Sequence, residues 1–455
     1  MAHSNIAIVV LAAGLGTRMK SNLPKVMHPI AGRPMIRHLL ATLEALAPEK
    51  LVVVIGEEME QVARAAAPWP TVVQRERLGT GHAVLAARPV VDGHRGDVLI
   101  VYGDTPLLSS ETLERMLEAR RSERRPAVVV LGFRPADPGA YGRLVAGGAG
   151  SLEAIVEARD ASTEQLSIGL CNSGVMAVDG TQLFGLLDRV GNGNAKGEYY
   201  LTDIVELVRA DGLACAVVES AEEELIGVNS RVELAVAESI VQDGLRARAM
   251  ANGVTMIDPR TVYMSFDTRL GRDVVVGPFV VFAPGVSVGN GVDIRGFCHL
   301  EGVSIADDAQ IGPFARLRPG ADIGHGAHIG NFVEIKNANI EERAKVNHLT
   351  YIGNARVGAG ANVGAGTITC NYDGFFKERT DIGAGAFIGS NSSLVAPVKI
   401  GAGAFIGAGS VVTREVAADS LAVTRGPHVE KEGWAKRFRD RRLAEKAART
   451  SSRQS

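Results

Sequence analysis

The chain has 455 residues, of which 46% are hydrophobic and 22% are charged, and its formal net charge is -2. This composition excludes disorder over most of the length and predicts two or three globular domains. A near-neutral chain has no positive field suited to a phosphate polyanion, so we expect no nucleic-acid partner. Glycine is unevenly distributed, with 25 glycines in residues 271–410 against 24 in the first 230, which predicts two regions of different architecture.

Hydropathy and cysteine content indicate a cytoplasmic protein. No run approaches 18 apolar residues, and the first apolar run, residues 6–13, has no lysine or arginine before it. We therefore expect neither a membrane span nor a signal peptide. The four cysteines stand far apart without a CxxC pair, so the sequence suggests neither a zinc site nor a disulfide framework.

The first region is predicted to hold a mostly parallel sheet. Residues 6–11 read as a buried strand, which runs into a Gly-rich turn and, after Pro34, into an amphipathic helix. Further strands are expected at 51–55, 98–102 and 127–131, with helical stretches such as 111–121 between them. Strands alternating with helices are typical of α/β folds, which bind ligands at the carboxyl ends of the strands.

Two patterns lie at such strand ends. In the stretch from Leu11 to Lys25, Gly14 and Gly16 let backbone amides approach a nucleotide, while Arg18 and Lys25 can neutralise phosphate charge. Met19 replaces the third glycine of a dinucleotide fingerprint, and no P-loop ending follows. The alternative is an ordinary strand-to-helix turn with surface basic residues.

The second pattern is Tyr102-Gly103-Asp104, directly after the predicted strand 98–101. A carboxylate at a strand end, beside a glycine that leaves space for a ligand, is suited to holding a hard divalent cation on a polyphosphate. Taken singly, Asp104 could equally serve as a turn residue or a helix cap.

The two regions are joined by residues 230–251, which contain no proline and one glycine. Their pattern predicts a helix of about six turns. We place domains at 1–230 and 252–455, with 231–251 as a linker helix between them. A surface helix packed on the first domain is the alternative.

An aliphatic or aromatic residue recurs at every sixth position of the second region, often followed by glycine. These residues are Leu270, Val276, Phe282, Val288, Ile294, Leu300, Ile305, Ile311, Leu317, Ile323, Ile329, Ile335, Ile340, Val346, Ile352, Val357, Val363, Ile382, Ile388, Leu394, Ile400, Ile406 and Val412. Such a period fits neither a helix nor a long strand, but it predicts a solenoid of short strands in which three hexapeptides close one coil. A twelve-residue excursion at 370–381 breaks the period, which indicates a functional loop.

Eight blocks in the first region occur in the order seen in sugar-1-phosphate nucleotidyltransferases. They are Leu11 to Lys25, Gln74 with residues 78–83, Tyr102-Gly103-Asp104, Tyr141-Gly142-Arg143, Ile155-Val156-Glu157, Asn172-Ser173-Gly174, residues 198–203 and Gly227-Val228-Asn229. In the second region, Arg316 to Pro319, Asn331 to Lys336, Asn347 to Tyr351 and Gly364 to Thr369 are similar to hexapeptide acyltransferases. The whole chain resembles the bacterial family of bifunctional N-acetylglucosamine-1-phosphate uridylyltransferases and glucosamine-1-phosphate acetyltransferases.

The resemblance implies a fold and an activity. The fold is a Rossmann-like nucleotidyltransferase domain, a long linker helix and a left-handed parallel β-helix, α/β overall. The enzyme is expected to acetylate glucosamine 1-phosphate with acetyl-CoA, and then to couple the resulting N-acetylglucosamine 1-phosphate to UTP. The products would be UDP-N-acetylglucosamine for peptidoglycan and lipopolysaccharide synthesis, and pyrophosphate.

Roles in the uridylyl site are likewise implied by the resemblance. Nucleotide contacts are expected from Leu11, Ala12, Ala13, Gly14, Gln74, Gly79, Thr80, Tyr102 and Gly103, and phosphate contacts from the catalytic Arg18 and Lys25. Gly142, Glu157 and Asn172 would hold the N-acetylglucosamine part, and Asp104 with Asn229 would ligate Mg²⁺. Local structural roles compete with these assignments: Asn172 could form a turn, Glu157 could end a strand and Asn229 could cap the next helix.

Roles in the acetyl site follow in the same way. His348 would be the base that takes a proton from the sugar amine as the amine attacks the acetyl-CoA thioester. Arg318 and Lys336 would bind the sugar phosphate, Tyr351 and Asn362 the sugar, and Ala365, Asn371, Tyr372, Ser390, Ala408 and Arg425 acetyl-CoA. A structural histidine and solvated surface charges are the alternatives. Asn347 departs from relatives that place glycine there, which bears on backbone conformation.

Assembly and the tail complete the expectations. A homotrimer is implied, because flat coil sides can pack together and the excursion could complete a neighbour's pocket.

The tail 431–455 has nine basic and three acidic residues and is expected to be a solvated helix that fades into disorder, with nucleic-acid binding as the alternative. Two other functions stay open: a single-activity nucleotidyltransferase whose solenoid only assembles or regulates, and a non-catalytic scaffold that binds sugar nucleotides.

Overall fold

The computed structural model describes residues 5–194 and 197–451 and divides the chain into two compact units. The first unit comprises Met1–Arg269 and Val281–Val286, and the second comprises Leu270–Val280 and Ser287–Ser455. Helix α9 (Arg231–Ala251), which coincides with the predicted linker, clusters with the first unit.

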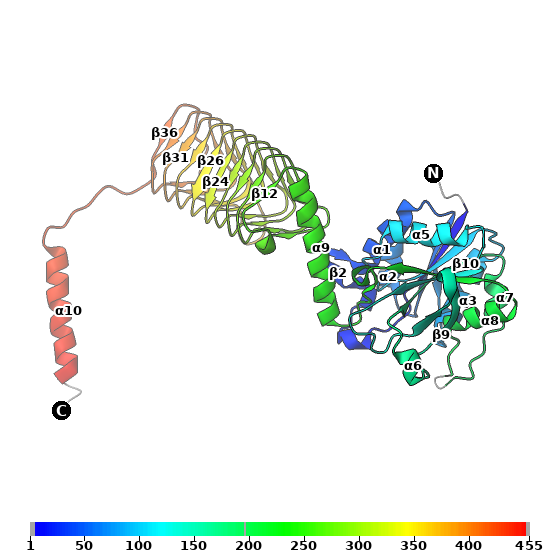
Figure 1. Cartoon of the computed structure of the whole chain (residues 1–455). Helices are drawn as coiled ribbons and strands as arrows, with labels where there is room; N and C mark the ends of the chain where they lie inside the picture. Colours follow the sequence, from blue (N-terminus) through cyan, green and yellow to red (C-terminus); the bar gives the residue numbers. More distant parts are fainter. Residues whose placement is uncertain (1–4, 195–196, 452–455) are drawn as a thin grey trace. The chain divides into compact units, whose positions relative to one another are not determined.

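The first unit is an α/β fold around one sheet with the strand order β11-β7-β10-β6-β1-β4-β5 (Figure 1). Its strands are β1 (Ile6–Leu11), β4 (Lys50–Ile55), β5 (Thr71–Val73), β6 (Asp97–Tyr102), β7 (Val128–Phe133), β10 (Cys171–Asp179) and β11 (Cys215–Ser220), with β8 (Arg143–Ala146) and β9 (Leu152–Val156) beside β10. Strand β10 runs antiparallel to β6 and β7, and the other neighbours on this path are parallel. The predicted mostly parallel sheet is therefore confirmed.

The sheet is buried on both faces, as the continuous apolar run of β1 requires. Ile6, Ile8 and Val10 contribute to one core cluster, and the alternate residues of the strand contribute to the other. The helices of the unit are α1 (Met35–Ala45), α2 (Glu60–Ala66), α3 (Thr80–Ala86), α4 (Arg88–Val91), α5 (Ser110–Arg120), α6 (Thr163–Leu166), α7 (Leu183–Leu187), α8 (Ile204–Ala210) and α9. Helix α1 buries Leu39 and Leu43 in the first cluster, and α3 buries residues in the second.

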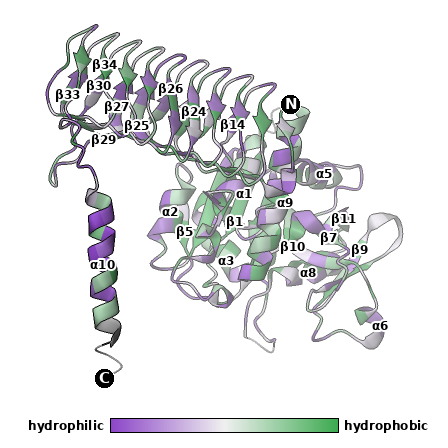
Figure 2. Cartoon of the chain, turned by 90° about the vertical axis from the view of Figure 1, so that its left-hand side faces the viewer, coloured by the Kyte–Doolittle hydropathy of each residue, from purple (hydrophilic) through white to green (hydrophobic). Residues whose placement is uncertain are grey.

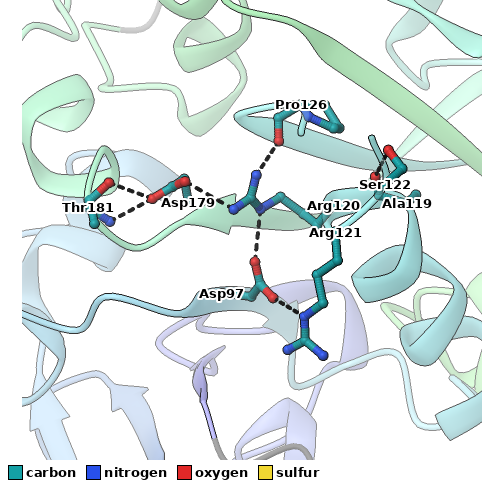
Figure 3. A network of polar contacts seen from close by, with 8 residues as sticks. All are labelled: Asp97, Ala119, Arg120, Arg121, Ser122, Pro126, Asp179 and Thr181. Carbon is teal, nitrogen blue, oxygen red and sulfur yellow. Dashed lines mark hydrogen bonds and ion pairs between the residues drawn. The ribbon is translucent and has the colours of Figure 1, made fainter. Parts of the chain in front are cut away.

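A buried charge network joins the amino end of β6 to helix α5 (Figure 3). Asp97 accepts hydrogen bonds from Arg120 Nε at 2.9 Å and from Arg121 Nε at 2.6 Å. Arg120 also pairs with Asp179 of β10 at 3.0 Å and donates to the carbonyl of Pro126. Because buried charges are tolerated only when they are paired, the network fixes the ends of two strands against one helix.

The second unit is a parallel β-helix whose short strands stack coil upon coil (Figure 1). One run of strands comprises β15 (Val275–Val276), β18 (Asp293–Ile294), β21 (Gln310–Ile311), β24 (His328–Asn331), β26 (Lys345–His348), β28 (Asn362–Val363), β31 (Phe387–Ile388), β34 (Phe405–Ile406) and β36 (Leu421–Ala422). The other coil sides include β22 (Arg316–Leu317), β23 (Ala321–Ile323), β25 (Glu334–Ile340), β27 (Tyr351–Val357), β29 (Ile368–Cys370), β30 (Thr380–Ile382), β32 (Ser393–Val395), β33 (Val398–Ile400) and β35 (Val411–Val412). All the sixth-position residues that the sequence predicted to point inward are buried except Leu270.

One corner of the coils carries a ladder of exposed aromatic rings, the Phe ladder, formed by Phe279, Phe297, Phe314 and Phe332. Consecutive rings stack with centroids 4.9 to 5.1 Å apart. All four residues have φ between 55° and 62°, a left-handed backbone conformation that residues other than glycine rarely adopt. Leu349 continues this corner on the next coil, at φ 51°.

After the coils the chain forms helix α10 (Trp434–Ser451), whose described side chains are exposed. Hydrophilic colour recurs along the length of α10 in Figure 2, which is expected of a solvated basic helix. The last predicted tail residues, 452–455, lie outside the described residues. Among the helices that are described, none combines the length and apolar character needed to cross a bilayer.

Candidate active sites

The Gly-rich turn after β1 brings Lys25 close to the ends of the central strands. Gly16 has φ 65°, and a Cβ atom on it would lie 2.6 Å from Lys25 Cβ, so glycine is needed at this position for Lys25 to approach. Ala12 donates its backbone N–H to the carbonyl of Val54 at 2.8 Å, which anchors the start of the turn on β4. The predicted phosphate-binding turn therefore has a conformation that its glycines explain.

Asp104 and Asn229 converge on the ammonium group of Lys25. Lys25 Nζ forms an ion pair with Asp104 Oδ2 and donates to Asn229 Oδ1 at 2.9 Å. The amide nitrogen of Asn229 donates to the carbonyl of Gly227 at 3.0 Å, which turns its oxygen towards Lys25. Two oxygen ligands far apart in the sequence thus meet around one cation.

Neither Asp104 nor Asn229 is a helix cap. Ser109 caps α5, its hydroxyl accepting from Thr112 N at 3.2 Å, and Ser230 caps α9 in the same way. The capping alternatives for Asp104 and Asn229 are therefore wrong. The pair supplies one carboxylate and one amide oxygen, which are ligands that a hard divalent cation prefers. Within residues 5–194 and 197–451 no group of three or more His, Cys, Asp and Glu side chains is placed to hold a metal ion.

Lys25 and Asp104 border a cavity of about 280 Å³ at the carboxyl ends of β1 and β6. Its lining includes the predicted Leu11, Ala12, Ala13, Gly14, Lys25, Gln74, Gly79, Thr80, Tyr102 and Asp104. Gly103 lies just behind it, where a Cβ atom would be 3.2 Å from the side chains of Ala12 and Val26. The structure thus gathers the predicted nucleotide residues around one hollow.

Tyr102 connects this cavity to the predicted sugar residues. Burial, and secondarily the carboxylate of Asp104, raise the pKa of Tyr102 well above that of a free phenol. Glu157 adds a smaller contribution in the same direction, which places it within electrostatic reach of the ring. Gly174, at φ 86°, leaves the space for the Tyr102 ring, since a Cβ atom there would lie 2.7 Å from it.

The three predicted sugar residues lie together beside Tyr102. Asn172 donates its backbone N–H to the carbonyl of Gly142 at 2.8 Å, and its side-chain oxygen accepts from Gly174 N at 2.9 Å. A Cβ atom on Gly142 would be 3.6 Å from Glu157 Oε1. Asn172 does form a local turn, so the structural reading of its side chain holds as well.

Four residues that line the cavity were missed from the sequence: Val26, Arg77, Ala83 and Glu198. Arg77 Nε donates to the carbonyl of Ala13 at 3.2 Å. Ala83 and Glu198 belong to blocks that carried the resemblance, and Arg77 lies between Gln74 and residues 78–83, but nothing in their spacing marked them as lining residues. Arg18 is exposed on a short 3-10 helix (Thr17–Met19) and does not line the cavity.

In the second unit, His348 is held by the preceding coil. Its Nδ1 atom lies 2.6 Å from Asn331 Oδ1, and the two residues are register partners of β26 and β24. His348 is exposed and borders a cavity of about 400 Å³. That cavity is also lined by Arg295, Gln310, Gly312, Pro313, Phe314, His328, Ile329, Gly330, Asn331, Phe332 and Asn347.

A cluster of three cations lies on a different coil side. Lys336 has a lowered pKa, chiefly because of the positive charge of Lys377 and then that of Arg318. Arg318 pairs with Glu334 at 2.6 Å. Lys377 belongs to the excursion at 370–381 and was not predicted as a site residue; its only sequence signal was a position within the break of the repeat.

The excursion is an ordered turn. The Asp373 carboxylate accepts from the backbone N–H groups of Phe375 at 2.7 Å and Phe376 at 2.6 Å, and these bonds lower its pKa. Asn371 Nδ2 donates to Asn354 Oδ1 at 2.8 Å, which ties the excursion to the coil. The side chains of Phe375 and Phe376 at its tip are 85% and 70% exposed.

Four of the predicted acetyl-CoA residues, Ala365, Ser390, Ala408 and Arg425, form a column that begins at His348, whereas Asn371 and Tyr372 lie in the excursion. Gly366 N bonds to His348 O, Asn391 N to Ala365 O, and Gly409 N to Ser390 O. The guanidinium of Arg425 donates to the carbonyl of Ala408 at 3.0 Å. His348, Ala365, Ser390 and Ala408 therefore follow one another on successive coils, about 4.8 Å apart, over about 14 Å.

The predicted sugar residues of this site occupy two coil sides. Asn362 lies on β28, beside Lys345 of β26, the strand that ends at His348. Tyr351 lies on β27, beside β25 with its Lys336. The corner between the two sides carries Leu349, which is 63% exposed.

Comparisons with known proteins agree with this organisation. Residues 8–166 match the family described as MobA-like NTP transferase domain, and residues 267–302, 302–337 and 379–414 match the bacterial transferase hexapeptide family (six repeats). Similar proteins include the "Bifunctional protein GlmU" of Paramagnetospirillum magneticum, 64% identical over 447 residues, and that of Rhodospirillum rubrum, 66% identical over 433. These alignments cover 98% and 95% of this chain and 99% and 97% of the relatives.

Proposed function

This chain belongs to the family of bifunctional GlmU proteins, and we propose that its two units carry the two activities separately, with 1–230 as the uridylyl part, 231–251 as the link and 252–455 as the acetyl part. The protein acetylates glucosamine 1-phosphate with acetyl-CoA and joins the product to UTP, giving UDP-N-acetylglucosamine and pyrophosphate. The observation that carries the assignment is the convergence of Lys25, Asp104 and Asn229 at a cavity lined by the nucleotide-binding turn.

Uridylyl transfer needs positioning and charge neutralisation rather than a covalent intermediate. An oxygen of the sugar phosphate attacks the α-phosphorus of UTP in line, and pyrophosphate leaves. The nucleoside is proposed to occupy the cavity between residues 11–14 and Gln74, with Lys25 and Arg18 facing the phosphates. The N-acetylglucosamine part would contact Gly142, Glu157 and Asn172, which lie beside Tyr102 at the edge of that cavity.

Asp104 and Asn229 are proposed to hold Mg²⁺. The proposal is supported by the convergence of their oxygens on a positive charge, the Lys25 ammonium. When bound, the divalent ion neutralises phosphate charge and orients the polyphosphate. Lys25 would then be available for a phosphate oxygen, because the ion and the ammonium compete for the same two ligands.

Acetyl transfer is proposed to depend on His348. An Asn331 oxygen can only accept, so the 2.6 Å contact places the ring proton on Nδ1 and leaves the lone pair of Nε2 for the sugar amine. The sugar amine gives a proton to Nε2 of His348 and attacks the thioester carbonyl, and the coenzyme leaves as its thiol.

The remaining residues fit the two substrates. Arg318, Lys336 and Lys377 form a cluster of positive charge suited to the sugar phosphate. The small residues Ala365, Ser390 and Ala408 form the column that begins at His348. The length of this column suits the extended arm of a coenzyme A ester. Asn371 and Tyr372 would contact the same substrate from the excursion.

A homotrimer is supported by the division of the acetyl residues over two coil sides. Asn362 and Tyr351 lie on opposite sides of the corner at Leu349, so two copies packed side by side would bring the two sets together. The exposed tip formed by Phe375 and Phe376 suits burial against such a neighbour. We place the enzyme in the cytoplasm, since UTP and acetyl-CoA are its substrates.

The test is a coupled reaction of the full chain with glucosamine 1-phosphate, acetyl-CoA and UTP, with products resolved by mass. The wild type should release pyrophosphate and free thiol. Asp104→Ala should stop at N-acetylglucosamine 1-phosphate, whereas His348→Ala should make UDP-N-acetylglucosamine only when N-acetylglucosamine 1-phosphate is supplied. A solenoid that served only assembly or regulation would leave thiol release absent from the wild type.

A further inference from the structure

The side-chain amide of Gln74 is held in one orientation at the wall of the nucleotide cavity. Gln74 is 5% exposed and lines the cavity, and its backbone N–H donates to Ile55 O at 2.8 Å. Its Nε2 atom lies 3.1 Å from the carbonyl oxygen of Gly79 and 3.3 Å from Nδ1 of His82. A carbonyl oxygen can only accept, so the amide must present its NH₂ group to Gly79. The group that Gln74 retains for a ligand is therefore the acceptor Oε1.

The second contact defines the state of His82. Both hydrogens of an amide are donors, so Nδ1 of His82 must accept, and the ring is neutral with its proton on Nε2. His82 lies in the first turn of α3, and its ring centroid is 6.4 Å from that of Tyr199. Residues 78–81 are held to Tyr199 by two backbone hydrogen bonds. Gly81 N–H donates to the carbonyl of Tyr199 at 2.8 Å, and Tyr199 N–H donates to the carbonyl of Leu78 at 2.7 Å. His82 is not among the described residues that line the cavity, and it contacts Gln74, which does line it.

We propose that His82 is a positioning residue for base selection, which locks the Gln74 amide with its oxygen towards the nucleobase. The proposal rests on the uridylyl activity proposed above. Uracil carries hydrogen on N3 and can donate to this oxygen, whereas N3 of cytosine is an acceptor and would face it with a lone pair. A reversed amide would suit cytosine, but it would direct oxygen at the Gly79 carbonyl and at Nδ1 of His82. Removing the His82 acceptor leaves one amide hydrogen without a partner and lets the amide turn away.

The test compares UTP with CTP as substrates of the full-length enzyme. His82→Phe keeps a ring against Tyr199 but has no acceptor, and His82→Leu removes the acceptor and the ring. We expect the ratio of kcat/KM for UTP to that for CTP to fall about tenfold in both variants, the effect of roughly one hydrogen bond. His82→Asn, whose side-chain oxygen can occupy the position of Nδ1, should restore most of the ratio.

Acetyl transfer by the second unit is the control for enzyme concentration, and it should be unchanged in all three variants. Equal loss of activity with UTP and CTP in the phenylalanine and leucine variants would show a merely structural histidine and would overturn the proposal. An unchanged ratio of kcat/KM for UTP to that for CTP would also overturn it. The same holds if this ratio is as low in His82→Asn as in His82→Leu. A wild type that uses neither nucleotide would instead refute the uridylyl activity itself.

Discussion

Asn331 holds the imidazole of His348 from the neighbouring coil, with 2.6 Å between Asn331 Oδ1 and His348 Nδ1. The bond fixes both the tautomer and the plane of a ring that is otherwise exposed. We expect Asn331→Leu to lower kcat for acetyl transfer about tenfold or more, because the free ring spends only part of its time with Nε2 unprotonated and correctly aimed. Asn331→Asp, which keeps the acceptor, should retain more activity than the leucine variant. The thiol-release assay checks this, and equal activity in all three proteins would contradict it.

The pairing of Lys25 with Asp104 and Asn229 gives a second prediction. Asp104→Asn keeps an oxygen donor but removes the negative charge, so the apparent affinity for Mg²⁺ should fall. Asp104→Ala should lower uridylyl turnover about 100-fold or more, since a charge-stabilising group is lost. Pyrophosphate release as a function of Mg²⁺ concentration measures both effects. Acetyl transfer should be unchanged, and full turnover of the alanine variant at saturating Mg²⁺ would refute the metal assignment.

The coil interior could be predicted almost completely from the sequence, because a six-residue period determines which side chains face inward. From Val276 to Val412 every sixth-position residue that the sequence singled out is buried. Leu270, at the start, is only partly covered. The Gly-rich turn was also predicted, but the need for glycine at position 16, with its positive φ and the close approach of Lys25, is visible only in the structure.

The parts that could not be predicted depend on side chains that meet across long separations. Lys377 reaches Lys336 because the excursion folds back through the bonds of Asp373, a geometry that spacing alone does not give. Arg77 enters the nucleotide cavity through a bond to the carbonyl of Ala13. The opposite placement of Asn362 and Tyr351 follows from the corner at Leu349 rather than from the period. The resemblance implied roles for individual residues, whereas the structure shows how these residues are arranged.

The network around Asp97 predicts a large effect on stability (Figure 3). Asp97→Ala removes a carboxylate that Arg120 and Arg121 share, and it leaves the buried Arg120 with Asp179 as its acidic partner. The free energy of unfolding should fall by about 3 kcal/mol, the lower end of the effect of breaking a buried ion pair, because Asp179 still compensates part of the charge. The matched control is Asp188→Ala, which breaks an ion pair of similar length with Arg88 at the surface and should cost less than about 1 kcal/mol. Urea unfolding of the full chain measures both, and equal costs would show that burial of the network contributes nothing.

The final prediction concerns the pH dependence of phosphate binding in the acetyl site. Lys377 and, to a smaller extent, Arg318 lower the pKa of Lys336, so Lys336 loses its charge at a lower pH than an isolated lysine. The charge that binds phosphate is present below that pKa and is lost as the pH rises through it, so KM for glucosamine 1-phosphate should rise on the alkaline side. In Lys377→Gln the largest cause of the shift is removed, and the rise should move to higher pH even though KM is larger throughout. Lys399→Gln changes a lysine paired with Glu415 outside the cluster and should leave the midpoint where it is. An unchanged midpoint in Lys377→Gln would show either that Lys377 does not lower the pKa of Lys336 or that Lys336 does not bind the phosphate.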